Sequence, residues 1–121
     1  MIGIGIDVVE LDRFARALAR SPGVARRLFT EAERAYGTRG ADPTAHLAAR
    51  FAAKEAAMKA LGVGLGAFGF HDVEVVRAPL GAPSLAVTGT AATLAAEQGV
   101  TGWRVSLSHT GRTAHAVVVA L

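Results

Sequence analysis

Two acidic residues, Asp7 and Glu55, stand in apolar surroundings where a charged side chain needs an explanation. The first lies in the stretch MIGIGIDVVEL (residues 1–11), in which branched apolar side chains alternate with two glycines and Asp7. This alternation predicts a buried strand with the branched side chains on one side and Asp7 on the other. Because burying an unpaired carboxylate costs several kcal/mol, Asp7 needs a neighbouring cation or a strand end that opens to solvent.

Glu55 lies in the strongest helical segment of the chain, AHLAARFAAKEAAMKALG (residues 45–62). Around this helix Glu55 falls between Phe51 and Lys59, and next to them runs a face of alanines: Ala49, Ala52, Ala56 and Ala60. Small residues let a helix approach a sheet or another chain closely, so we expect Glu55 and Lys59 to point toward that interface. The alternative is an ordinary Glu–Lys pair at i, i+4 spacing, worth a few tenths of a kcal/mol.

Two such carboxylates on separate elements could converge on one hard cation. Oxygen ligands suit Mg²⁺, which keeps water in its shell and often takes further ligands from phosphate groups. Arg50, Lys54 and Lys59 lie on the same helix and would supply positive charge for phosphate oxygens. The combination predicts phosphoryl transfer or pyrophosphate cleavage at a site that contains Asp7 and Glu55.

Other chemistries find less support in the sequence. The glycine run GVGLGAFG (residues 62–69) follows a helix, whereas phosphate-binding loops precede one, so it predicts a helix end and a flexible loop. The chain has no cysteine, which excludes thiolate metal sites and thiol nucleophiles. No Ser, His and acid set has the spacing of a hydrolase triad. The stretch SLSHTG (residues 106–111) predicts a ligand-binding edge, with Ser106 and Ser108 on one strand face and His109 at its end.

The elements that must position these residues mix helices with hairpins. After the first strand, the predicted elements are a helix over 10–20, a short helix from the capping box at Thr30 and Glu33 to about Gly37, a polar loop over 38–45 and the long helix stopped by Gly62. They continue with strands over 71–78 and 83–89, a helix over 90–99 capped by Thr90 or its neighbour, and two strands over 103–121 around a turn at 109–112. The predicted fold class is α+β with a mainly antiparallel sheet.

Composition and charge narrow the class of protein. With 121 residues, 51% of them hydrophobic, the chain predicts one domain over residues 1–121, and the absence of a signal-like N-terminus favours a soluble cytoplasmic protein. The net charge is +3, and the arginines cluster near the N-terminus: Arg13, Arg16 and Arg20 share one helix face, and Arg26 and Arg27 follow. This arginine stripe is either a solvated face or a surface for nucleic-acid phosphate or an acidic protein.

Three blocks of the sequence resemble the holo-acyl-carrier-protein synthases, small single-domain 4'-phosphopantetheinyl transferases. The blocks are GIGIDVVELDR (residues 3–13), RFAAKEAAMKALGVG (residues 50–64) and VSLSHT (residues 105–110), and they spread over nearly the whole chain. The resemblance implies a Mg²⁺-dependent transfer of 4'-phosphopantetheine from coenzyme A to a serine of apo acyl carrier protein, which releases adenosine 3',5'-bisphosphate.

The resemblance also assigns roles to residues. It implies that Asp7 and Glu55 hold Mg²⁺ with the coenzyme A pyrophosphate, and that Lys59 lies near the reacting phosphate as a charge stabiliser or in deprotonating the serine. Glu55, Lys59 and His109 form the expected catalytic set. The expected coenzyme-binding residues are Asp7, Arg50, Lys54, Lys59, Gly62, His109 and Thr110. The arginine stripe would bind the acidic carrier protein, and family members form homotrimers with each site between two subunits.

Two rival hypotheses remain open at the level of sequence. A nucleic-acid-binding module would use the arginine stripe, but it would also need base-reading aromatic or polar residues near the cations, and Phe14 lies among the core positions of that helix. A noncatalytic trimeric scaffold would use Asp7, Glu55 and Lys59 as a buried ion-pair network. Such a scaffold would bind no coenzyme A, which separates it from the enzyme.

Overall fold

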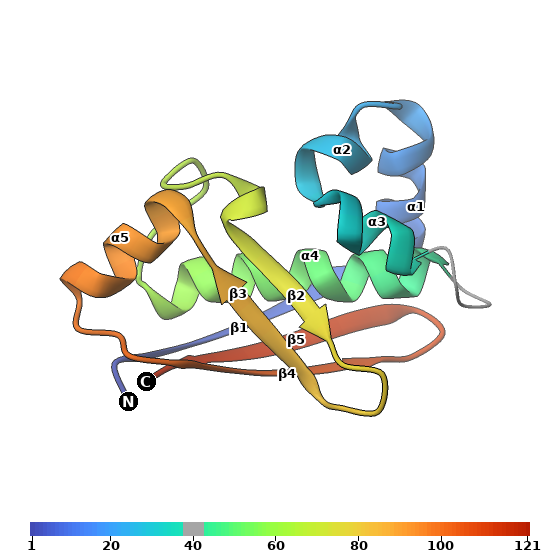
Figure 1. The fold of residues 1–121 in the computed structure, drawn as a ribbon. Coiled ribbons are helices and arrows are strands. Elements are labelled where there is room, and N and C mark those ends of the chain that lie inside the picture. Colours follow the sequence, from blue (N-terminus) through green and yellow to red (C-terminus); the bar gives the residue numbers. More distant parts are fainter. Residues whose placement is uncertain (38–42) are drawn as a thin grey trace.

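The computed structural model describes residues 1–37 and 43–121 and combines two antiparallel sheets with a long helix that packs on the larger one (Figure 1). In chain order the elements are β1 (Gly3–Glu10), α1 (Leu11–Arg20), α2 (Val24–Leu28), α3 (Glu31–Gly37), α4 (Pro43–Ala60), the 3₁₀ helix η1 (Phe70–Asp72), β2 (Val73–Arg77), β3 (Pro83–Val87), α5 (Gly89–Glu97), β4 (Trp103–His109) and β5 (Thr113–Ala120). The predicted α+β class is confirmed. Within the described residues, no helix is long and apolar enough to cross a bilayer.

The larger sheet has the strand order β1-β5-β4, and the smaller one pairs β2 with β3. Every pairing is antiparallel. In the larger sheet, Ala116 of β5 lies between Asp7 of β1 and Leu107 of β4, so β1 and β4 form its two edges. The β2–β3 hairpin crosses beside β4 (Figure 1) and contacts it without entering its hydrogen-bond ladder.

Helix α4 lies directly on the backbone of β1, and glycine makes this approach possible. A Cβ atom built on Gly5 would lie 1.9 Å from the carbonyl oxygen of Ala56, and one built on Gly3 would lie 1.9 Å from that of Ala60. The alanine face of α4 fills the rest of this contact, because Ala52, Ala56 and Ala60 are all buried. The expected close-packing face therefore serves the contact with the chain's own sheet.

The buried side of β1 is the reverse of what the run of branched residues suggests. Ile4, Ile6 and Val8 are 57%, 58% and 53% exposed, whereas the glycine side faces the helix. Period-two alternation is the same whichever side faces the core, and here the helix backbone needs the room that glycine leaves. Asp7 shares the glycine side of β1, which turns it toward α4.

Most other elements match the prediction, with differences at their ends. The capping box is confirmed: the backbone N–H of Thr30 donates to Glu33 (3.0 Å) and that of Glu33 donates to the Thr30 hydroxyl (3.2 Å). The long helix already begins at Pro43, a residue suited to a first turn, so only part of the predicted loop 38–45 can be a loop, and residues 38–42 lie outside the described residues. Helix α2 and η1 were not predicted from the sequence.

The N-terminus of α5 is capped from a distance. The residue before the helix is Thr88, which makes no capping hydrogen bond with its side chain. Instead the carboxylate of Asp72, in η1, accepts a hydrogen bond from the backbone N–H of Ala91 (3.2 Å). The predicted cap at Thr90 or its neighbour is therefore wrong, because a tertiary contact supplies the acceptor. At the other end, Gly99 ends the helix region with a φ of 84°, as expected.

An aromatic cluster fixes α1 against α4. The ring of Phe14 lies 5.6 Å from that of Phe51 on α4 and 6.1 Å from that of Phe29, centroid to centroid. Phe14 and Phe29 are buried. This cluster holds α1, which carries Arg13, against the helix that packs on β1 beside Asp7.

We expect Gly5→Ala to destabilise the fold strongly, because its Cβ would overlap the carbonyl oxygen of Ala56. Overpacking of this kind costs about 1–3 kcal/mol and more where backbone must move. Gly64→Ala is the control, since a Cβ there meets nothing within 4 Å and should leave stability within about 0.5 kcal/mol. Urea unfolding of the two variants measures the difference, and equal stabilities would contradict the close contact of α4 with β1.

Candidate active site

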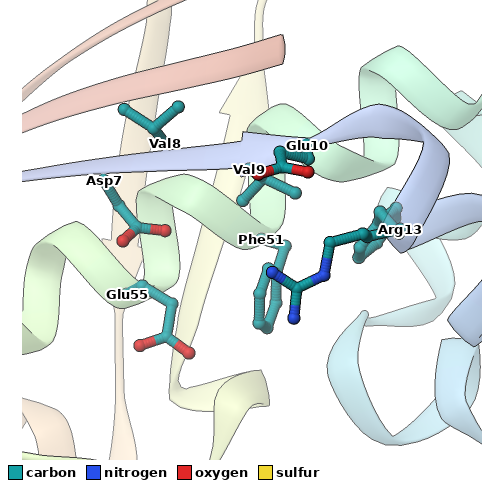
Figure 2. Close-up of a pocket in the computed structure, with 8 residues that line it drawn as sticks. Asp7, Val8, Val9, Glu10, Arg13, Phe51 and Glu55 are labelled. Carbon is teal, nitrogen blue, oxygen red and sulfur yellow. The ribbon is translucent and has the colours of Figure 1, made fainter. Parts of the chain in front are cut away.

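A pocket of about 390 Å³ opens where β1, α1 and α4 meet. Asp7 and Glu10 line it from β1, Arg13 from α1, and Phe51 and Glu55 from α4. Figure 2 shows the carboxylates of Asp7 and Glu55 pointing into the same space, with the Arg13 guanidinium at its other end and the Phe51 ring between. We call this the carboxylate pocket. The two acidic residues singled out in the sequence, far apart in the chain, thus come together.

Lys59 neutralises Asp7. The Lys59 ammonium donates to Oδ1 of Asp7 (3.1 Å) and to the backbone carbonyl of Ile6 (2.9 Å). The Lys59 side chain is 54% exposed and that of Asp7 18%. Asp7 therefore has both a cationic neighbour and partial access to solvent. Among the described residues, Lys59 forms an ion pair with Asp7 only.

The surroundings of Glu55 disfavour the charged form of its side chain. Burial and the nearby Asp7 carboxylate raise the pKa of Glu55, and the Lys59 ammonium only partly opposes them. A cation bound between the two carboxylates would remove their repulsion, and paired carboxylate oxygens are the ligands that Mg²⁺ prefers. Within the described residues, no group of three or more His, Cys, Asp and Glu side chains could hold a metal ion. Asp7 and Glu55 offer two carboxylates, and a cation held by them would take its other ligands from water and substrate.

Lys54 does not fit the predicted role beside phosphate oxygens. Its ammonium is fully buried and its three N–H groups are taken: it donates to Glu33 (2.8 Å) and to the backbone carbonyls of Phe70 (2.9 Å) and Val73 (2.6 Å). Burial lowers the pKa of Lys54, and the adjacent Glu33 opposes this. Lys54 is committed to holding α4 against α3 and the start of β2.

Glu33 is the partner that sequence reasoning missed. Besides closing the capping box and pairing with Lys54, it accepts a hydrogen bond from the backbone N–H of Val75 in β2 (3.0 Å). The only local signal is the capping box, which describes the helix end but says nothing about a lysine in α4. A buried carboxylate with all these partners is fully satisfied.

Arg50 and His109 lie together in a second pocket, of about 280 Å³, between α4, β4 and the β2–β3 hairpin. Arg77 and His46 also line it, and so do Ser106 and Ser108 of the predicted ligand edge. Among the residues that the structure describes, no acidic one lines this space, which we call the arginine pocket. Burial and the like charge of Arg77 lower the pKa of Arg50, while Glu33 and Tyr36 oppose them. Arg77 was not predicted from the sequence.

The two pockets lie at opposite edges of the larger sheet. Val9 of β1 and His109 of β4 both pair with Ala114 of β5, so one strand separates them. With neighbouring strands about 4.8 Å apart, the two edges are about 10 Å from each other. The structure therefore does not bring His109 and Arg50 into the carboxylate pocket of the same chain.

The remaining predicted residues lie outside both pockets or on the surface. Gly62 has a φ of 69° and ends the α4 region, which only glycine does without strain. The hydroxyl of Thr110 accepts hydrogen bonds from the backbone of Arg112 and Thr113 and so shapes the β4–β5 turn. The arginines of the stripe are all exposed on α1 or α2: Arg13, Arg16, Arg20, Arg26 and Arg27. Arg13 also lines the carboxylate pocket.

Comparison with known proteins shows the family of the chain. Residues 3–119 match the family model described as the 4'-phosphopantetheinyl transferase superfamily. The chain belongs to this superfamily. A curated relative from Salinispora arenicola, named Holo-[acyl-carrier-protein] synthase, is 55% identical over 122 residues, covering 99% of this chain and 98% of the relative.

Two solved structures of the superfamily extend the likeness to the fold. A holo-[acyl-carrier-protein] synthase from Neisseria meningitidis matches with a TM-score of 0.89 and 34% identity, over 100% of this chain and 98% of that one. The Helicobacter pylori holo-[acyl-carrier-protein] synthase, solved in complex with coenzyme A, matches with a TM-score of 0.85 and 28% identity, over 98% and 99% of the two chains. This chain is therefore a transferase-family protein over nearly its whole length.

We expect Lys54→Met to lower the free energy of unfolding by about 3–5 kcal/mol, because it leaves the buried Glu33 carboxylate without its cation. The same substitution at the exposed Lys59, on the same helix, should cost less than about 1 kcal/mol. Chemical denaturation of both variants measures the contrast. A Lys54→Met protein as stable as Lys59→Met would refute the structural role of Lys54.

Proposed function

We propose that the protein transfers the 4'-phosphopantetheine group of coenzyme A to a serine of apo acyl carrier protein and releases adenosine 3',5'-bisphosphate. The observation that carries this proposal is the carboxylate pocket, where the carboxylates of Asp7 and Glu55 converge and Lys59 forms an ion pair with Asp7. The likeness to holo-[acyl-carrier-protein] synthases, one of them solved with coenzyme A, supports it. We take residues 1–121 to form one transferase domain and keep the cytoplasmic location as a prediction.

In the proposed reaction, the serine hydroxyl oxygen of the carrier protein attacks the β-phosphorus of coenzyme A. A new P–O bond forms to the serine as its hydroxyl proton passes to solvent, the bond to the bridging pyrophosphate oxygen breaks, and adenosine 3',5'-bisphosphate leaves with that oxygen. Asp7 and Glu55 would hold Mg²⁺, which when bound supplies positive charge to the pyrophosphate oxygens. Lys59, whose ammonium lies 3.1 Å from Asp7, would place a second positive charge beside the reacting phosphate.

The arginine pocket would hold the adenosine bisphosphate end of the coenzyme. Arg50, Arg77 and His109 line it, and no acidic residue in the described ranges 1–37 and 43–121 does, so a polyanion meets mainly positive charge among these residues. A guanidinium binds phosphate oxygens well because its planar N–H groups match their geometry. His109, at the rim, would contact the coenzyme rather than the carrier serine. Lys54 has no place in this scheme.

We propose further that the protein is a homotrimer in which each active site is shared by two subunits. The two pockets lie at opposite edges of one sheet, so a neighbour's arginine pocket could complete the carboxylate pocket of the first chain. The outer face of β1 offers a contact surface, because Ile4, Ile6 and Val8 are more than half exposed there. A row of exposed branched residues favours burial against another copy.

The arginine stripe supports an acidic protein as the second substrate. Its exposed cations begin at Arg13, inside the carboxylate pocket, and continue along α1 and α2. An acidic helix lying on this face would present its serine to the carboxylate pocket, and the charges would speed the encounter more than they add affinity. Phe14 is buried, so the stripe lacks an exposed aromatic residue on which a nucleic-acid base could stack.

Intact-mass measurement of apo acyl carrier protein tests the function. With this protein, coenzyme A and Mg²⁺, we expect the carrier to gain one phosphopantetheine, and a chelator should abolish the gain. Asp7→Asn and Glu55→Gln should lower the rate at least about 100-fold while the fold survives, because each removes one charged oxygen ligand. No gain with several carriers, together with no binding of coenzyme A, would refute the enzyme and support the scaffold.

Mixing two inactive variants tests the shared site. Glu55→Gln damages the carboxylate pocket and Arg50→Met damages the arginine pocket, so each variant alone should be nearly inactive at low coenzyme A. In randomly co-assembled trimers, about a quarter of the sites would combine two intact halves. Co-expression should therefore restore about a quarter of the wild-type rate. Activity no higher than the sum of the two parents would show that each chain builds its site alone.

A further inference from the structure

Tyr36, on α3, lies behind the arginine pocket and contacts two of the residues that line it. Its ring centre is 4.5 Å from the guanidinium carbon of Arg50 and 5.7 Å from the ring centre of His46, which it meets edge-on at 85°. Arg50 and His46 both line the arginine pocket, whereas Tyr36 lines the neighbouring hollow on the other side of Arg50. Tyr36 thus stands where it can orient the pocket's cation without touching a ligand in the pocket.

Arg50 depends on such a neighbour because other contacts hold it weakly. Its Nη1 donates to the backbone carbonyl of His46 at 3.2 Å, and its Nε is buried without a hydrogen-bond partner. Among the described residues it forms no salt bridge. An arginine residue that is only 2% exposed would ordinarily be fixed by a carboxylate. Here the flat face of an aromatic ring takes that place, as a cation–π contact.

The ring of Tyr36 is itself carried on a rigid support. Three residues earlier on α3, Glu33 pairs with Lys54 on α4, and Lys54 is four residues after Arg50. The two helices therefore meet at two successive levels, one a buried ion pair and the other the Tyr36–Arg50 stack. The ion pair is satisfied on all sides and fixes the spacing of α3 and α4. At the Tyr36–Arg50 contact, by comparison, Arg50 still lines the arginine pocket.

We propose that Tyr36 is a positioning residue that orients Arg50 toward the phosphate oxygens of the adenosine bisphosphate end of coenzyme A. This inference rests on the proposed function of the arginine pocket. It also gives α3 a part in substrate binding, although no α3 residue lines that pocket. A ring at this position keeps the guanidinium in one orientation before the ligand arrives, so less freedom is lost on binding.

Calorimetric binding of adenosine 3',5'-bisphosphate to three variants tests the inference. Tyr36→Leu removes the ring and should weaken binding about tenfold, which corresponds to the loss of a buried cation–π contact. Tyr36→Phe keeps the ring and loses only the hydroxyl, which makes a lesser electrostatic contribution to Arg50 than burial does, so this variant should bind within about threefold of wild type. Glu31→Gln, an exposed change on the same helix, is the control and should bind as wild type. Equal affinity of the Leu and Phe variants would overturn the role of the ring.

Steady-state kinetics then separate positioning from a merely structural effect. Tyr36→Leu should raise KM for coenzyme A about tenfold and keep kcat within about twofold, since the carboxylate pocket is untouched. Thermal unfolding identifies any loss of stability separately. A fall in kcat with an unchanged KM, or a lower Tm with unchanged binding, would contradict positioning and leave Tyr36 as a packing residue.

The variant Arg50→Met distinguishes failure of this inference from failure of the proposed function. If Tyr36 acts through Arg50, the double variant Tyr36→Leu/Arg50→Met should bind no worse than Arg50→Met alone. Additive losses would overturn the link between the two residues. If Arg50→Met binds adenosine 3',5'-bisphosphate as wild type, the arginine pocket is not the coenzyme site, and the proposal for Tyr36 falls with it. Weakened binding in Arg50→Met but not in Tyr36→Leu refutes the Tyr36 inference alone.

Discussion

The close contact between the backbone of β1 and helix α4 is the constraint on which the rest of the structure depends. Gly3 and Gly5 let the carbonyl oxygens of Ala60 and Ala56 lie where side chains would otherwise stand. This contact turns the same side of β1 toward the helix and so delivers Asp7 to Glu55 and Lys59. The two carboxylates of this pocket come together because a strand and a helix pack tightly, which explains why they stand on two rigid elements rather than on loops.

A second contact, between α3 and α4, organises the opposite edge of the molecule. Glu33 and Lys54 form an ion pair that is buried and bonded on every side, so α3 is fixed to the helix that carries Arg50. Such a pair adds little to stability compared with an apolar pair, but it tolerates only one arrangement. Helix α4 thus serves both pockets, with Glu55 on one face and Arg50 on another.

The sequence predicted the chemistry better than the geometry, for physical reasons. Asp7 and Glu55 could be paired because a carboxylate in an apolar run has few stable solutions. The exposed side of β1 could not be predicted, since period two does not say which side faces the helix. Lys54 was misassigned because its partner, Glu33, already satisfied a local capping pattern. Nothing local in the sequence indicates that Arg50 and His109 share a pocket away from Asp7.

The placement of the two pockets at opposite edges of one sheet has a consequence for how the protein would work in a cell. With sites completed between chains as proposed, an isolated newly made chain would have no working site, and catalytic capacity would appear only once subunits meet. Capacity would then rise more steeply than chain number at low abundance, because assembly follows mass action. The amount of chain that a cell makes would then determine when its carrier proteins are converted to the holo form.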